Sequence, residues 1–168
     1  MDAILHNFLS AELAAGLRLA EASDCLRLLP LGPEPVQRYL AHFDAATLVR
    51  DASGRVRAAQ GFTVGLSFPS DYLRRADPFA VAAFLAPAEV FLPNVRPPFL
   101  CLGRIAPGTG LCDLLYQAFE IGTGAKVTMR EDDALNAEAC AWARRNLDRF
   151  PVDRRSLKRT DFVVEQLP

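Results

Sequence analysis

Apolar residues recur at spacings of three and four over residues 3–20, near the start of the chain. They are Leu5, Phe8, Leu9, Leu13 and Leu17. Because an α-helix completes a turn in about 3.6 residues, this spacing places these side chains on one stripe. The pattern therefore predicts an amphipathic helix whose stripe is buried against the rest of the protein.

The next part of the chain has the alternating pattern typical of β-strands. In GFTVGLSFP, residues 61–69, large apolar side chains alternate with small or polar ones, and Pro69 ends the run. Shorter runs at 25–31 and 35–43 are interpreted as two more strands. The alanine-rich run at 79–86 is interpreted as another, although its composition also suits a helix. Turn-length connections between these runs predict a four-stranded antiparallel meander.

The second half of the chain begins with a long stretch that shows neither the helical spacing nor the alternation of a β-strand. Residues 88–110 contain four prolines together with many apolar side chains, so we expect a long, ordered loop there. Helical spacing returns at residues 109–122, with Thr109 as the expected N-cap, and again at 131–150. The order of helix, strands, loop and helices is typical of an α+β fold, in a single domain covering residues 1–168.

The charge of the chain argues against two classes of partner. There are 19 Lys and Arg against 20 Asp and Glu, and a net charge of −1 gives no field that would attract nucleic acid or an anionic membrane. The balance is uneven, because residues 144–159 hold seven basic side chains against two acidic ones. We interpret this segment as a solvated helix end leading into a basic tail over 151–168, with a docking surface for an acidic partner as the alternative.

Four cysteines, Cys25, Cys101, Cys112 and Cys140, are spread along the chain without a C-x-x-C pair, and there are only two histidines. This usage indicates neither a zinc site nor a disulfide framework, and it predicts free thiols in a reducing cytoplasm. The first residues lack the pattern of a secretory signal, and no apolar run is long enough to span a bilayer, which favours the same compartment. Taken alone, Cys101 would be interpreted as a buried, inert thiol.

Four short motifs change that interpretation because of their order. They are LSFPSDYL at 66–73, LPNV at 92–95, CL at 101–102 and DALN at 133–136. In this order and spacing the chain resembles the ubiquitin-conjugating enzyme family, in the divergent form found in bacterial ubiquitin-like modification systems. The resemblance covers residues 61–150, and the first 60 residues match the family only in the order of their elements.

The resemblance implies a UBC-like α+β fold and an activity. Cys101 would accept a ubiquitin-like modifier protein as a thioester from an activating enzyme, and would pass it to an amine on a target protein. No metal or cofactor is implied for this chain, since ATP is used by the activating enzyme. Bacterial systems of this kind occur often in antiphage defence. A sulfur nucleophile suits this chemistry because a thiolate attacks a thioester without a strong base.

Two further residues are candidates for the site, each with two roles left open. Asn94 could donate from its amide to the oxyanion formed during aminolysis, or it could stabilise the loop through hydrogen bonds to the backbone. Asp133 could orient the incoming lysine and ease the loss of its proton, or it could be a carboxylate that favours a helix N-terminus.

The sequence also departs from the family pattern. Leu92 replaces the usual histidine, Leu73 and Ala134 replace prolines, and the seven positions from Asn94 to Cys101 are one fewer than is usual. A non-catalytic module of the same fold that binds the modifier is therefore kept as the alternative function. An unrelated thiol hydrolase is a third hypothesis, and it would require a base beside Cys101.

Overall fold

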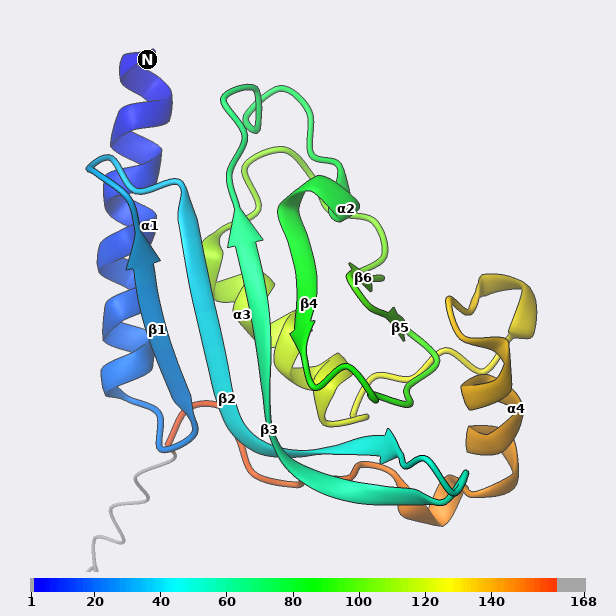
Figure 1. Ribbon diagram of the computed structural model, residues 1–168. Helices are drawn as coiled ribbons and strands as arrows, with labels where there is room; N and C mark the ends of the chain where they lie inside the picture. The colour runs from blue at the N-terminus through cyan, green and yellow to red at the C-terminus, as the bar shows by residue number, and fades with distance from the viewer. Residues whose placement is uncertain (1, 160–168) are drawn as a thin grey trace, which may run out of the picture.

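The computed structural model describes residues 2–159 (Figure 1). Within them the chain forms an N-terminal helix, a six-stranded antiparallel sheet and C-terminal helices. The α+β class expected from the sequence is confirmed. Of the tail predicted over 151–168, residues 160–168 lie outside the described part. No helix of the described residues is long and apolar enough to cross a membrane.

The first helix, α1, covers Ala3–Glu21 and begins at Asp2, whose carboxylate accepts a hydrogen bond from the Ile4 backbone N–H at 3.1 Å. Its buried stripe includes Leu5, Leu9 and Leu19, whereas Leu17 is 39% exposed. The difference follows from helix geometry, because fourteen residues make nearly four full turns at about 3.6 residues per turn. Leu19 is therefore in line with Leu5, and Leu17 lies about a third of a turn away.

The sheet contains two strands more than the sequence predicted. Its order is β1-β2-β3-β4-β6-β5, and every pair is antiparallel. The strands are β1 (Leu26–Leu31), β2 (Arg38–Arg50), β3 (Val56–Ser67), β4 (Ala82–Ala86), β5 (Val95–Arg96) and β6 (Phe99–Leu100). The first four form the expected meander, but the count of four was wrong, because the proline-rich stretch contributes the last two.

Two strand boundaries also differ from the sequence pattern. Strands β2 and β3 continue past a bulge between Phe43 and Ala46 into a long hairpin that extends beneath the rest of the sheet in Figure 1. The alanine-rich run starts with a single helical turn, α2 (Pro78–Val81), before it becomes β4. Asp77 begins that turn by accepting a hydrogen bond from the Phe79 N–H at 3.0 Å. Both interpretations of this run therefore apply, each to one half of it.

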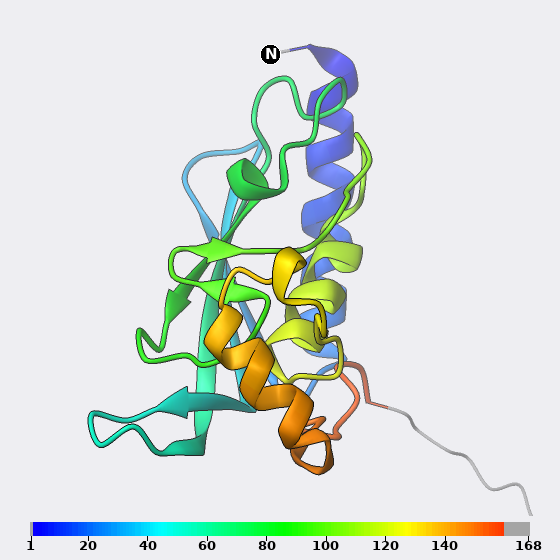
Figure 2. The same cartoon turned by 90° about the vertical axis from the view of Figure 1, so that its right-hand side faces the viewer.

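Helix α3 (Leu111–Gly122) packs beside α1 on one face of the sheet (Figures 1 and 2). The residues that carry its helical spacing are all buried, namely Leu111, Leu114, Leu115 and Ala118. The expected N-cap is wrong, since the helix begins after Gly110. The side chain of Glu12 from α1 accepts a hydrogen bond from the Leu111 N–H instead. The N-terminus of α3 is thus capped by Glu12, a residue distant in sequence, and not by a neighbouring residue.

The helix predicted over 131–150 is divided into three pieces. They are a 3₁₀ turn at Glu131–Asp133, helix α4 at Ala137–Arg145 and a second 3₁₀ turn at Leu147–Arg149. Asn136 interrupts the helical pattern because its backbone is extended and its side chain accepts from the Ala139 N–H at 3.0 Å. Helix α4 lies beyond β5, away from α1 (Figures 1 and 2).

Candidate functional site

The stretch between Asn94 and Cys101 is a tight hairpin. Val95 pairs with Leu100 and Arg96 pairs with Phe99, which leaves Pro97 and Pro98 as the turn. The hairpin joins the sheet through the pairing of Phe99 with Ala83 and through a hydrogen bond of 2.9 Å from the Phe84 N–H to the Pro98 carbonyl. Prolines fit the turn because it requires no N–H donor from them.

Asn94 and Cys101 face each other at the base of this hairpin. The Cys101 N–H donates to the Asn94 carbonyl oxygen at 2.9 Å. A loop one residue shorter than usual therefore still closes, because the residues between them form two cross-strand pairs and a two-residue turn. Cys101 is half-buried, while its neighbours Leu100 and Leu102 are fully buried. The loop anchors itself through the two leucines and leaves the thiol partly open to solvent.

The side chain of Asn94 is bound on both sides by one residue, Thr128. The Asn94 Nδ2 donates to the Thr128 Oγ1 at 2.7 Å, and the Thr128 backbone N–H donates to the Asn94 Oδ1 at 2.8 Å. Asn94 is only 6% exposed, so these bonds satisfy a polar side chain that would otherwise be costly to bury. Within the described residues the amide has no hydrogen bond to the Cys101 sulfur. The contacts of this side chain therefore hold the loop in place.

Thr128 is a residue of the site that the sequence did not indicate. It lies between α3 and the first 3₁₀ turn, in a stretch without period or motif. Its backbone carbonyl accepts from the thiol of Cys140 in α4, with sulfur and oxygen 3.4 Å apart. Burial raises the pKa of the Cys140 thiol, which keeps it protonated and able to donate.

The DALN motif meets the same loop. The Asn136 N–H donates to the Pro93 carbonyl at 3.1 Å, while the Asn136 side chain begins α4. Asp133, three residues earlier, is exposed at the end of the 3₁₀ turn, and its carboxylate pairs with the Arg130 guanidinium at 3.3 Å. The structure thus brings the segment of Asp133 against the loop, with the Asp133 carboxylate directed to a neighbouring arginine.

The first motif fixes the far end of the loop. Tyr72 is fully buried, and its hydroxyl donates to the Thr109 carbonyl at 2.7 Å, just before α3 begins. Its ring packs on Phe68 at 4.8 Å between centroids. Burial raises the pKa of Tyr72 to about 12, so the hydroxyl keeps its proton for this bond. All four motifs are therefore structural neighbours of the segment from Pro93 to Thr109.

Neither histidine is beside Cys101. His42 lies on β2, where its Nδ1 and the Thr63 Oγ1 are 3.0 Å apart. Strands β3 and β4 separate β2 from β6, so at roughly 4.8 Å per strand spacing His42 is at least about 14 Å from the hairpin. His6 is exposed on α1. Among the described residues, no histidine or carboxylate is hydrogen-bonded to the Cys101 thiol, and the geometry of a thiol hydrolase dyad is absent there.

The cysteines are expected to differ in reactivity. Cys25 and Cys140 are buried, whereas Cys101 and Cys112 are partly exposed. Burial raises the pKa of Cys112, and the carboxylates of Glu12 and Asp113 raise it further, so that its thiolate is scarce at neutral pH. Iodoacetamide should therefore label Cys101 first, about tenfold faster than Cys112. Mass spectrometry of digested peptides would measure both rates in one sample, and labelling of Cys112 before Cys101 would contradict the expectation.

Comparisons with known proteins add no identification: no family model matches the chain, and no curated protein matches it. The chemistry of the site therefore rests on its own geometry. It consists of a partly exposed thiol at the base of a hairpin, bonded through its backbone to Asn94, and an exposed carboxylate on the adjoining segment; the amide of Asn94 is held by Thr128. The described residues contain no cluster of side chains that could hold a metal ion.

Proposed function

We propose that the protein is a ubiquitin-conjugating-type enzyme, a cysteine acyltransferase that carries a ubiquitin-like protein on Cys101. The observation that supports this most directly is that the motifs lie on, or contact, the single segment from Pro93 to Thr109, which carries the Cys101 thiol. Asn94 pairs with Cys101 through the backbone, Pro93 pairs with Asn136, and Tyr72 anchors the loop where α3 begins. Motifs that match by chance would have no reason to contact a common loop.

The reaction has two exchange steps. In the first, the Cys101 thiolate attacks the thioester carbonyl that joins the modifier to the activating enzyme; a new C–S bond forms and the thiolate of that enzyme leaves. In the second, an amine of the target attacks the Cys101 thioester, an amide bond forms, and the Cys101 thiolate leaves while the amine proton passes to solvent. The energy comes from ATP spent earlier by the activating enzyme.

The proposed roles of the other site residues follow from their contacts. Asn94 holds the loop through Thr128, and its remaining amide hydrogen is the donor available to an oxyanion. Asp133 is the carboxylate that would receive the incoming lysine, and it would exchange Arg130 for that lysine. The proposal includes the setting implied by the resemblance, namely a bacterial cytoplasm and a role in antiphage defence.

The test is a charging reaction with a candidate activating enzyme and a ubiquitin-like modifier, together with ATP. On a non-reducing gel the unaltered protein should form an adduct that a thiol reagent removes. Cys101→Ala should abolish the adduct, and Cys112→Ala is the matched control because Cys112 is the other partly exposed cysteine. An adduct that survives Cys101→Ala would disprove this nucleophile. Binding of the modifier without any thioester would instead support the non-catalytic module.

A further inference from the structure

The last described residues are held firmly against the body of the protein. The Val152 N–H donates to the Thr123 carbonyl after α3 at 2.8 Å, and the Arg159 N–H donates to the Ala22 carbonyl after α1 at 2.9 Å. Residues 152–159 therefore cross from the end of one helix to the end of the other. Arg159 also donates to the Glu21 carbonyl and pairs with Asp24. Up to Arg159 the backbone of the predicted tail is therefore hydrogen-bonded to the fold, while most of its side chains are exposed.

Asp153 and Arg155 fix the middle of this crossing to the bulge of β2. Asp153 accepts from the Ala46 N–H at 2.8 Å, and Arg155 donates both to Asp153 and to the Asp44 carbonyl, each at 2.7 Å. The hydrogen bond from Arg155 lowers the pKa of Asp153 to about 2, below the ordinary value of about 3.9. The ionised carboxylate therefore stabilises the folded chain above about pH 4, and this contribution is lost as the pH falls towards 2.

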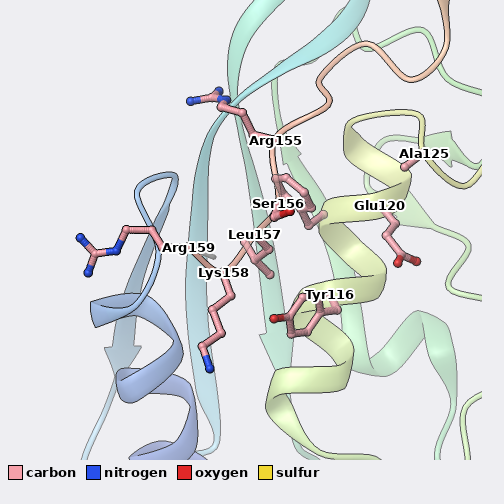
Figure 3. A pocket seen from close by; sticks show the side chains of 9 residues that line it. Tyr116, Glu120, Ala125, Arg155, Ser156, Leu157, Lys158 and Arg159 are labelled. Atoms are coloured by element: carbon pink, nitrogen blue, oxygen red, sulfur yellow. The ribbon is translucent and has the colours of Figure 1, made fainter. Parts of the chain in front are cut away.

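Between this crossing, α1 and α3 the surface is hollowed. Two adjoining hollows of about 620 and 420 Å³ share Tyr116 and Lys158, and together we call them the groove. Figure 3 shows the larger one, with Leu157 directed from the crossing towards α3 and Lys158 near Tyr116. Phe119, Leu157 and Leu19 give the groove a buried apolar floor. Its size is that of a site for a few side chains.

The rim of the groove is basic. Four of its lining residues are Lys or Arg, and Glu120 is the only acid among them. Arg155 and Arg159 are already paired with Asp153 and Asp24. Arg18 and Lys158 are exposed and form no ion pair with any other described residue. The groove thus combines an apolar floor with cations that have no partner in the described part of the fold.

We propose that the groove binds an acidic segment of a partner protein, with one or two apolar side chains of that segment in the hollows. Charge complementarity selects this partner, because Arg18 and Lys158 would pair with carboxylates while the floor accepts leucine or phenylalanine. The proposal stands apart from catalysis, since none of the residues that line the groove belongs to the site around Cys101.

The probe is a fluorescein-labelled peptide with glutamates flanking a Leu-Phe pair, titrated with the full chain and followed by anisotropy. We expect saturable binding that weakens as salt is raised. Arg18→Glu and Lys158→Glu should each raise Kd about tenfold. Arg154→Glu is the matched control, because Arg154 is exposed in the same crossing but does not line the groove, and it should change Kd less than about twofold.

Several results would overturn the proposal. The first is an absence of saturable binding. The second is a rise in Kd for Arg154→Glu as large as that for Arg18→Glu or Lys158→Glu. The third is a peptide with serines in place of the Leu-Phe pair that binds as tightly as the original peptide. Residues 160–168 have a similar acidic and apolar character. If the peptide bound only after Phe162→Ser in the full chain, the chain itself would be the occupant of the groove. If the protein instead self-associated in a way that depends on concentration and on Lys158, the occupant would be a second copy. Cys101→Ala should leave peptide binding unchanged, so this proposal and the proposed function fail separately.

Discussion

Changing Cys101 to serine is expected to slow amine transfer at least a hundredfold, while the protein keeps its fold. A serine hydroxyl is not appreciably ionised at neutral pH, and no histidine or carboxylate among the described residues is bonded to the side chain at 101 to activate it. An ester that did form would also react slowly with amines, because an alkoxide is a poorer leaving group than a thiolate. Single-turnover transfer to free lysine measures the effect.

Two features make this substitution informative. The serine adduct should survive a thiol reagent and be cleaved by alkali, whereas the cysteine adduct is removed by both. Cys112→Ser provides the control for loss of a thiol elsewhere on the surface, and it should transfer at the original rate. Transfer by Cys101→Ser at that same rate would mean that the group at position 101 is not the carrier.

Changing Asn94 to alanine is expected to reduce the free energy of unfolding by about 2–3 kcal/mol and to slow transfer as well. The substitution removes both hydrogen bonds to Thr128 and leaves the backbone N–H and the hydroxyl of this half-buried residue without their partner. The segment from Pro93 to Cys101 would then keep only the bond from the Asn136 N–H to the Pro93 carbonyl as its hydrogen-bonded attachment to the described chain before α4. Urea unfolding measures the stability, and single-turnover transfer to lysine measures the activity.

This pair of measurements separates the two roles of Asn94. A residue that holds the loop affects stability and transfer together, and its coupling to Thr128 should appear in a double-mutant cycle with Thr128→Val as about 1 kcal/mol. A residue that acts only on the oxyanion affects transfer alone. Asn7→Ala, at an exposed position of α1, controls for loss of an amide and should change stability by less than about 0.5 kcal/mol. Unchanged stability in Asn94→Ala would refute the loop-holding role.

The sequence predicted those elements in which the repeat of apolar residues extends over many positions. Helices α1 and α3 each have a long apolar pattern and formed close to the expected residues, whereas strand β3 begins five residues before the run predicted at 61–69. Strands β5 and β6 were not predicted, because each has only two residues, which is too short to show an alternating pattern, and because Pro97 and Pro98 indicate a loop. The break at Asn136 was missed for a similar reason, since the apolar spacing continues across it while the backbone does not.

In the candidate site, the local motifs lie on or beside one loop, but they could not give the distant residues that this loop contacts. The proximity of Asn94 and Cys101 follows from a short hairpin, which their separation in sequence permits. Thr128 is 34 residues from Asn94, and no pattern in the chain marks it. The C-terminal crossing depends likewise on distant contacts, because Arg155 and Arg159 bind carbonyls 111 and 138 residues away. From the sequence, the positive charge of these two arginines indicated only a solvated segment and not these contacts.

The central claim is that Cys101 carries the modifier, and its most direct test locates the thioester within the chain. The protein is charged with the activating enzyme, modifier and ATP, quenched in acid, digested without reduction and examined by mass spectrometry. We expect the C-terminal residues of the modifier to be attached to the peptide containing Cys101, and hydroxylamine to release them. Attachment to Cys25, Cys112 or Cys140, or a modifier bound without any covalent link, would contradict it.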